Sequence, residues 1–311
     1  MGWGSSIEVA REARAAREAL QRNENRSAAA HAARAAKAAP QNPDLWFLYA
    51  YAARLAGDYQ ASVNAYTRGL QARPSSIEGL SGLAQTYAKM GRSKEAEEML
   101  KRVLAANPSS DADLRLAGEL TLNTDPKLAL AYLSRADAIR PSARTELLMA
   151  RAYQRAGDQN KAKELLERAR NRAPRDSEVV RSVAAYYRDT GQYDLAISTL
   201  KSLPSEAPSY LSELGYTYEL SGKRAEAADI FLKAANAAPS EVELQLTAAQ
   251  AQVNAKRASR AEPLLQRVEA SAPSHYRLHA IRGSIARSAH GRASECDSKS
   301  PVVSTSRKAV A

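Results

Sequence analysis

The sequence predicts an all-α fold built from helix–turn–helix repeats, on three periodic observations. Prolines recur at intervals of 31 to 34 residues from residue 40 onward. A turn residue, usually glycine, stands 17 residues before seven of these prolines, and a small residue stands 12 residues before all eight. A period in this range indicates an array of small units, each unable to bury its apolar face alone. The prolines are Pro40, Pro74, Pro108, Pro141, Pro174, Pro208, Pro239 and Pro273. The turn residues are Gly57, Gly91, Thr124, Gly157, Gly191, Gly222 and Lys256.

Each repeat is predicted as two antiparallel helices with the turn residue between them. In the stretch 158–173, Ala162, Leu165 and Leu166 follow the spacing of one helix face, and 145–156 shows the same pattern. A turn glycine ends the first helix because it adopts a left-handed conformation. The proline ends the second helix because it lacks the backbone N–H that the helix needs.

The units can be followed in order from the two ends. The first, about residues 7–42, carries Asn23 in place of the turn glycine and suits a capping repeat. The 31-residue step contains Pro204, which is predicted to shorten the second helix of the sixth unit. A helix at 275–287 would shield the last pair. Residues 1–6 and the aperiodic, polar tail 291–311 are predicted to be disordered, which leaves 7–290 as the array.

The repeats resemble the tetratricopeptide repeat family. Trp46 stands in the family's tryptophan position, and the unit around residues 211–239 matches the family pattern almost in full. The matching residues are Leu211, Leu214, Gly215, Tyr218, Ala227, Phe231, Ala234 and Pro239. The resemblance implies a right-handed superhelical solenoid of about eight repeats plus a C-terminal capping helix. It also implies that the first helices line a concave surface that holds a peptide or a partner helix.

Motifs of catalysis are not found in the sequence. It contains no glycine-rich phosphate loop and no nucleophile elbow, and Cys296 is its single cysteine. His275 and His279 have the spacing of a two-histidine metal site, but no third ligand accompanies them. We therefore expect a non-enzyme that needs no cofactor and no metal.

The register of the first helices predicts a partner-binding groove. Two groups stand out in it: an aromatic and basic group early in the array, and five arginines in the middle. Arginines that converge on one surface would bind an acidic group through bidentate hydrogen bonds. The predicted partner-binding residues are Phe47, Tyr51, Arg54, Gln85, Lys89, Arg144, Arg151, Gln154, Arg155, Arg181, Arg188 and Tyr216.

Three interpretations of this surface remain open. The first is a scaffold that binds a partner protein, with an acidic segment as ligand. The second is nucleic-acid binding, which the net charge of +11 suggests, although acidic residues are interspersed throughout. The third is a periplasmic scaffold module of an envelope or polysaccharide-export assembly. Without a recognisable signal peptide the default expectation is a cytoplasmic protein, or a periplasmic one if the chain is a fragment of a longer protein. No apolar stretch reaches the length of a membrane span.

Overall fold

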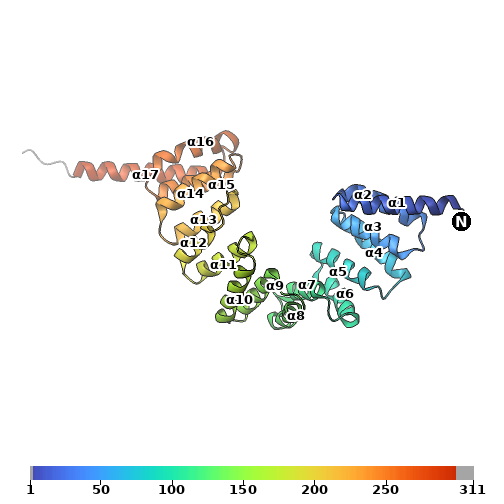
Figure 1. Cartoon of the computed structure of the whole chain (residues 1–311). Coiled ribbons are helices and arrows are strands. Elements are labelled where there is room, and N and C mark those ends of the chain that lie inside the picture. The colour runs from blue at the N-terminus through green and yellow to red at the C-terminus, as the bar shows by residue number, and fades with distance from the viewer. Residues whose placement is uncertain (1–2, 299–311) are drawn as a thin grey trace, which may run out of the picture. The chain divides into compact units, whose positions relative to one another are not determined.

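A computed structural model describes the backbone of residues 3–298 and the side chains of residues 6–289. These residues form helices and no strand, as the periodicity predicted (Figure 1). The chain divides into two compact units, unit 1 up to Pro174 and unit 2 from Arg175 onward. The helices of unit 1 are α1 (Trp3–Gln21), α2 (Asn25–Ala38), α3 (Pro43–Leu55), α4 (Tyr59–Ala72), α5 (Ile77–Lys89), α6 (Ser93–Ala106), α7 (Asp111–Thr121), α8 (Pro126–Ile139), α9 (Ala143–Arg155) and α10 (Gln159–Arg172).

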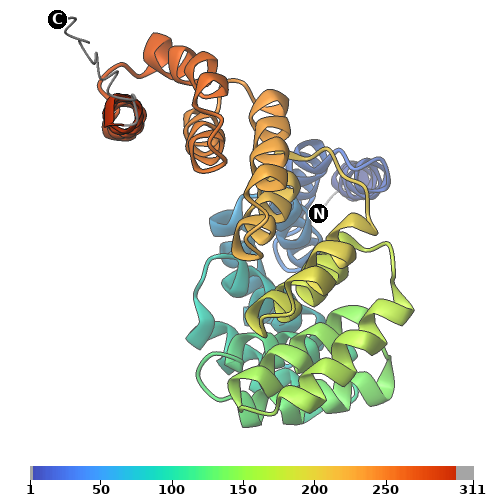
Figure 2. The ribbon, with the colours of Figure 1, turned by 90° about the vertical axis from the view of Figure 1, so that its left-hand side faces the viewer.

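Unit 2 continues the same pattern of helix pairs. Its helices are α11 (Ser177–Asp189), α12 (Tyr193–Lys201), α13 (Pro208–Leu220), α14 (Arg224–Ala237), α15 (Val242–Asn254), the short 3₁₀ helix η1 (Ala258–Arg260), α16 (Glu262–Ser271) and α17 (Tyr276–Ser298). The described part of the chain therefore holds eight helix pairs and one further helix. Within each pair the two helices are antiparallel, as the hairpin of α9 and α10 in Figure 2 shows. This confirms the predicted number of repeats.

The turns use left-handed residues at the predicted turn positions except at Thr124, whose φ is not positive. The five turn glycines have φ between 72° and 84°, a region that costs a residue with a Cβ about 1–2 kcal/mol. Asn23 and Lys256 adopt the same conformation with φ of 59° and 60°. The predicted short helix is also present, because α12 has nine residues where the second helices of most repeats have 14.

The core alternates small and large side chains between facing helices. At Gly215 of α13, a Cβ atom would stand 3.0 Å from the ring of Phe231 on α14. A glycine at this point lets the two helices approach, and the aromatic ring fills the space that remains. Trp46, in the family's tryptophan position, is buried and donates a hydrogen bond from Nε1 to the carbonyl oxygen of Pro40 at 2.9 Å.

The ends of the array differ from the predicted boundaries. Helix α1 begins at Trp3 rather than at residue 7, and α17 continues to Ser298 rather than stopping near residue 290. Residues 3–6 and 291–298 are rich in serine and glycine, which are weaker helix formers, so nothing in their composition explains the longer helices. Residues 1–2 and 299–311, part of the predicted disordered termini, lie outside the described residues. Among residues 3–298 no helix is both long enough and apolar enough to span a bilayer.

Candidate binding groove

A pocket of about 460 Å³ lies on the first helices of four consecutive repeats in unit 1. Four of the predicted site residues line it: Arg54 on α3, Gln85 and Lys89 on α5, and Arg144 on α9. The helix between them, α7, provides half of the wall. We call this the α3–α9 pocket. Its remaining lining residues are Ala88, Ala112, Arg115, Leu116, Glu119 and Leu120.

Two of the cations in the α3–α9 pocket have no carboxylate partner. Among the described residues, no Asp or Glu forms an ion pair with Arg54 or Lys89. The guanidinium of Arg54 lies 5.3 Å from the ring centroid of Tyr51, and its Nε is buried without a hydrogen-bond acceptor. Burial raises the pKa of the nearby Tyr66 hydroxyl, and Arg54 opposes that shift. This half of the pocket therefore carries uncompensated positive charge.

The other two cations of the pocket are paired. Nη2 of Arg144 lies 3.2 Å and 3.1 Å from the two carboxylate oxygens of Glu119. Arg115 lies 3.8 Å from a carboxylate oxygen of Asp111, one helical turn earlier on α7. The Arg144–Glu119 pair is open to solvent, with side chains 53% and 43% exposed, so it contributes little to stability, whereas the Arg115–Asp111 pair is more shielded.

Two predicted site arginines of unit 2, unlike Arg54 and Lys89, have a carboxylate partner. Arg181 and Arg188 on α11 both donate to Glu213 on α13, at 2.6 Å and 3.4 Å. The Glu213 side chain is 14% exposed, so water screens these two bonds less than it screens the surface pairs of unit 1. Arg188 also lies 5.8 Å from the ring centroid of Tyr216, which is half exposed. Arg181 and Arg188 therefore share one carboxylate of their own chain, which offsets one of their two positive charges.

The structure corrects the prediction for Phe47. Its side chain is 2% exposed and cannot contact a partner. Two glycines explain this position, because Cβ atoms at Gly69 and Gly79 would fall 2.3 Å and 2.7 Å from the ring. The ring occupies the space that these glycines leave on α4 and α5. Tyr51 is 42% exposed and stays on the surface.

The five predicted arginines fall into both units. Arg144, Arg151 and Arg155 lie on α9 in unit 1, together with Gln154, while Arg181 and Arg188 lie on α11 in unit 2. Arg151 and Arg155 are exposed and Gln154 is half-buried. A shared arginine surface therefore stays a prediction. Glu146, on the same helix as Arg151, is buried and accepts hydrogen bonds from Arg172.

Two charged pocket residues, Arg115 and Glu119, were not among the predicted set, although the repeat register contains them. Glu119 follows Gln85 by 34 residues, and Gln85 follows Tyr51 by 34 residues. Arg115 stands seven residues after Pro108, as Arg181 stands seven residues after Pro174. Projecting each predicted position through all the repeats would have found both residues. His275 and His279 bond to Glu243 and to the Pro273 carbonyl, and the described residues form no group of three metal ligands.

The comparison with known families identifies the repeats. The tetratricopeptide repeat pattern matches residues 14–77, 53–117 and 147–210, which together span more than half of the chain. The chain belongs to the tetratricopeptide repeat family, whose helix-pair arrays serve as scaffolds for protein interactions.

One curated relative and several solved structures are similar to this chain. Cellulose synthase operon protein C of Pseudomonas fluorescens (strain SBW25) is 33% identical over 133 residues, which are 40% of this chain and 10% of that protein. The chain thus spans about a tenth of the length of that relative. A tetratricopeptide repeat protein from Parabacteroides merdae ATCC 43184 has a TM-score of 0.64 at 17% identity, with 79% of this chain and 99% of that chain covered. PilF of Pseudomonas aeruginosa has a TM-score of 0.54 at 17% identity, with coverages of 65% and 95%. These structures support the fold.

Proposed function

We propose that this protein is a non-catalytic scaffold that binds an acidic segment of a partner protein in the α3–α9 pocket. The observation that carries the proposal is the pair of cations, Arg54 and Lys89, that face the pocket without a carboxylate partner. A partner carboxylate would give the guanidinium of Arg54 a charge-assisted hydrogen bond. Tyr51 beside Arg54 adds an exposed aromatic face to the same end of the pocket.

A structural role explains part of this arrangement. Arg54 and Lys89 stand in the last turns of α3 and α5, where the helix dipole favours a positive charge by about 0.3–1 kcal/mol. The dipole accounts for the presence of cations at the two helix ends. It leaves unexplained why neither cation forms an ion pair, whereas Arg144, Arg181 and Arg188 on other first helices do.

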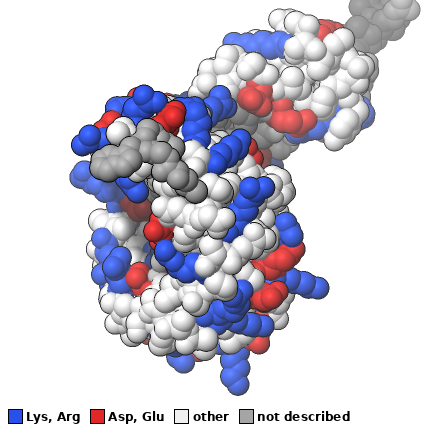
Figure 3. All heavy atoms as spheres, turned by 90° about the vertical axis from the view of Figure 1, so that its right-hand side faces the viewer, with Lys and Arg blue, Asp and Glu red and all other residues white. Residues whose placement is uncertain are grey.

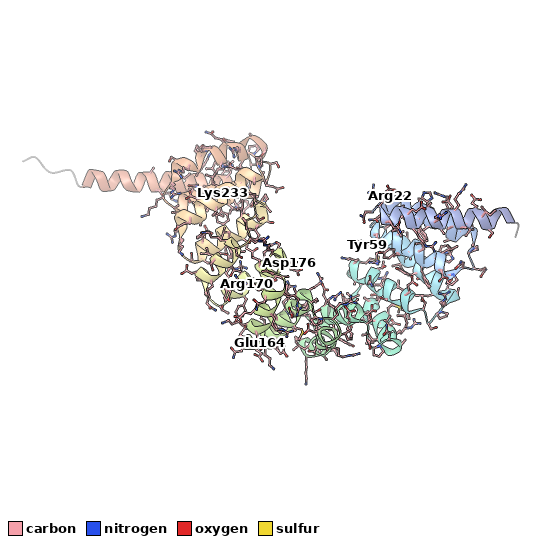
Figure 4. All side chains as sticks on the ribbon, viewed as in Figure 1. Arg22, Tyr59, Glu164, Arg170, Asp176 and Lys233 are labelled. Atoms are coloured by element: carbon pink, nitrogen blue, oxygen red, sulfur yellow. The ribbon has the colours of Figure 1, made fainter. Side chains whose placement is uncertain are left out.

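Binding of a labelled oligoglutamate peptide tests the proposal, with oligoglutamine as the neutral comparison. Arg54→Ala with Lys89→Ala should weaken the binding of oligoglutamate by about 1.5–3 kcal/mol for each charged hydrogen bond that is lost. The matched control is Lys163→Ala with Arg170→Ala on α10, which makes the same change in net charge (Figure 4). Equal losses in both double variants would show a general charge effect and no site.

Nucleic-acid binding is the competing outcome of the same measurement. On the face shown in Figure 3, Lys and Arg side chains are interspersed with Asp and Glu rather than gathered into one continuous surface. Binding to phosphates would show as a linear fall of log affinity with log salt, with a slope near −0.7 per phosphate for single strands. Tighter binding of single-stranded RNA than of oligoglutamate, with such a slope, would favour this second function.

A second candidate concerns the biological setting. The similarity to cellulose synthase operon protein C supports a scaffold that works beside a polysaccharide synthase. This setting is compatible with an acidic partner segment and does not replace it. Co-purification tests it: the synthase or export components of such a system should be retained by the wild-type chain and lost with Arg54→Ala and Lys89→Ala.

A further inference from the structure

Gln85, which lines the α3–α9 pocket, is hydrogen-bonded at only one end of its side-chain amide. Its Nε2 donates to the hydroxyl oxygen of Ser81, one turn earlier on α5, at 3.3 Å. Its Oε1 accepts no hydrogen bond from the described residues and is not buried. The side chain therefore leaves an open acceptor on the pocket wall.

A buried carboxylate decides which end of the amide is free. Oγ of Ser81 donates to Oδ1 of Asp113 on α7 at 2.6 Å, and Oγ of Ser110 donates to Oδ2 at the same distance. Asp113 is buried, and an ionised carboxylate can only accept. Since the Ser81 hydroxyl has a single proton, which Asp113 accepts, Ser81 can only accept from Gln85. The NH₂ group of Gln85 must then face Ser81, which leaves the carbonyl oxygen for a ligand.

The position of this acceptor relative to Lys89 indicates which donor it would meet. Gln85 and Lys89 are four residues apart on α5, so their Cβ atoms lie about 5–6 Å apart on one face. In an acidic residue of a peptide, the backbone N–H lies only a few bonds from the side-chain carboxylate. A ligand carboxylate at Lys89 therefore brings a backbone N–H of the same segment within reach of Gln85.

We infer that Gln85 determines specificity in the pocket by accepting a hydrogen bond from a backbone N–H of the partner segment, and that Ser81 positions it. This inference rests on the proposed binding of an acidic segment at Arg54 and Lys89. The ligand chemistry is an acidic peptide in extended form, because a helix uses its backbone N–H groups internally. A phosphate chain has only acceptors and gains nothing from Gln85.

The experiment compares the binding of two labelled peptides. One is oligoglutamate, and the other is oligoglutamate with esters in place of alternate backbone amides, which removes N–H donors without adding bulk. The wild-type chain should bind the amide peptide about two- to tenfold more tightly, the range that one neutral hydrogen bond supports. Gln85→Leu should bring the two affinities together. Gln71→Leu, at an exposed position of α4 outside the pocket lining, is the matched control and should keep the wild-type preference.

Variants of Ser81 test its positioning role. Ser81→Ala lets the Gln85 amide turn either way, so the preference for the amide peptide should fall. Ser81→Thr keeps the hydroxyl and should restore the preference. A purely structural role for Ser81 would weaken the binding of both peptides equally, so the ratio of the two affinities decides. An unchanged ratio in Ser81→Ala would overturn the positioning role.

The inference about Gln85 is overturned if Gln85→Leu keeps the wild-type preference for the amide peptide, or if the wild-type chain has no such preference. The proposed function survives either result if Arg54→Ala with Lys89→Ala still weakens the binding of oligoglutamate. If the wild-type chain binds neither peptide, both fail.

Discussion

The first helices of the two units carry arginines at similar positions and leave them in opposite electrostatic states. In unit 1, Arg54 faces a pocket without a carboxylate partner. In unit 2, Arg181 and Arg188 share the carboxylate of Glu213, which the next first helix supplies. The comparison teaches that an arginine in the register of a groove is a candidate binding residue only when the neighbouring repeat provides no acid.

The largest expected effect concerns what holds the pocket helices of unit 1 together. Phe47→Ala should lower the free energy of unfolding by about 3–5 kcal/mol, because the ring fills space between three helices. Hydrogen exchange should accelerate in α3–α5 and remain unchanged in unit 2, since repeat stability depends on nearest neighbours. Tyr51→Ala is the matched control and should change stability little, as its ring is exposed. Equal acceleration in both units would contradict the prediction.

Replacing Glu213 should leave Arg181 and Arg188 of unit 2 without their shared carboxylate, so that they resemble Arg54 of unit 1. Glu213→Gln removes the charge that Arg181 and Arg188 share, and it should cost about 1–3 kcal/mol of stability. The released arginines should then add a second binding event for oligoglutamate, measured by titration calorimetry. Glu206→Gln, in an exposed loop, controls for net charge. An unchanged stoichiometry would mean that freeing an arginine is not sufficient to create a site.

The turns give a smaller test of how the two units differ at their ends. Lys256 in unit 2 adopts a left-handed φ of 60° that is strained for a residue with a Cβ. Lys256→Gly should therefore raise the melting temperature, with a gain of up to about 1 kcal/mol after the loss of backbone entropy. Asn23→Gly in unit 1 should gain less, because asparagine tolerates this conformation. A destabilised Lys256→Gly would show that the side chain contributes contacts of its own.

The smallest expected effect is a loss of stability at low pH, which both units should show. A hydrogen bond from Arg282 holds the pKa of Glu269 in unit 2 below its ordinary 4.5, and one from His31 does so for Glu12 in unit 1. A carboxyl with a lowered folded-state pKa stabilises the fold above pH 4.5, and this contribution is lost as the pH falls through the folded-state pKa. Glu269→Gln should remove part of the acid dependence of unit 2 only. Melting curves below pH 4.5, with hydrogen exchange to separate the two units, check this. A change in unit 1 rather than in unit 2 would contradict the prediction.

Much of the fold could be predicted because successive repeats place the same types of residue at the same spacing. The turn glycines and the short helix before Pro204 depend on neighbouring residues or on one fixed period. The candidate site could be predicted only in part. Register placed Arg54, Gln85, Lys89 and Arg144 correctly on the pocket wall and placed Phe47 there wrongly. A side chain's depth depends on the sizes of residues on two other helices, which the register of its own helix does not contain.

The sequence by itself determined the number of repeats, the helix pairs and the surface on which binding residues should be sought. It did so because backbone conformation and helix periodicity are properties of residues close together in the chain. Only the tertiary structure decided which cations are neutralised, since Glu213 lies 32 residues from Arg181 and Glu119 lies 25 residues from Arg144. Ion pairing depends on distances between side chains of different repeats, and those distances are set when the helices pack.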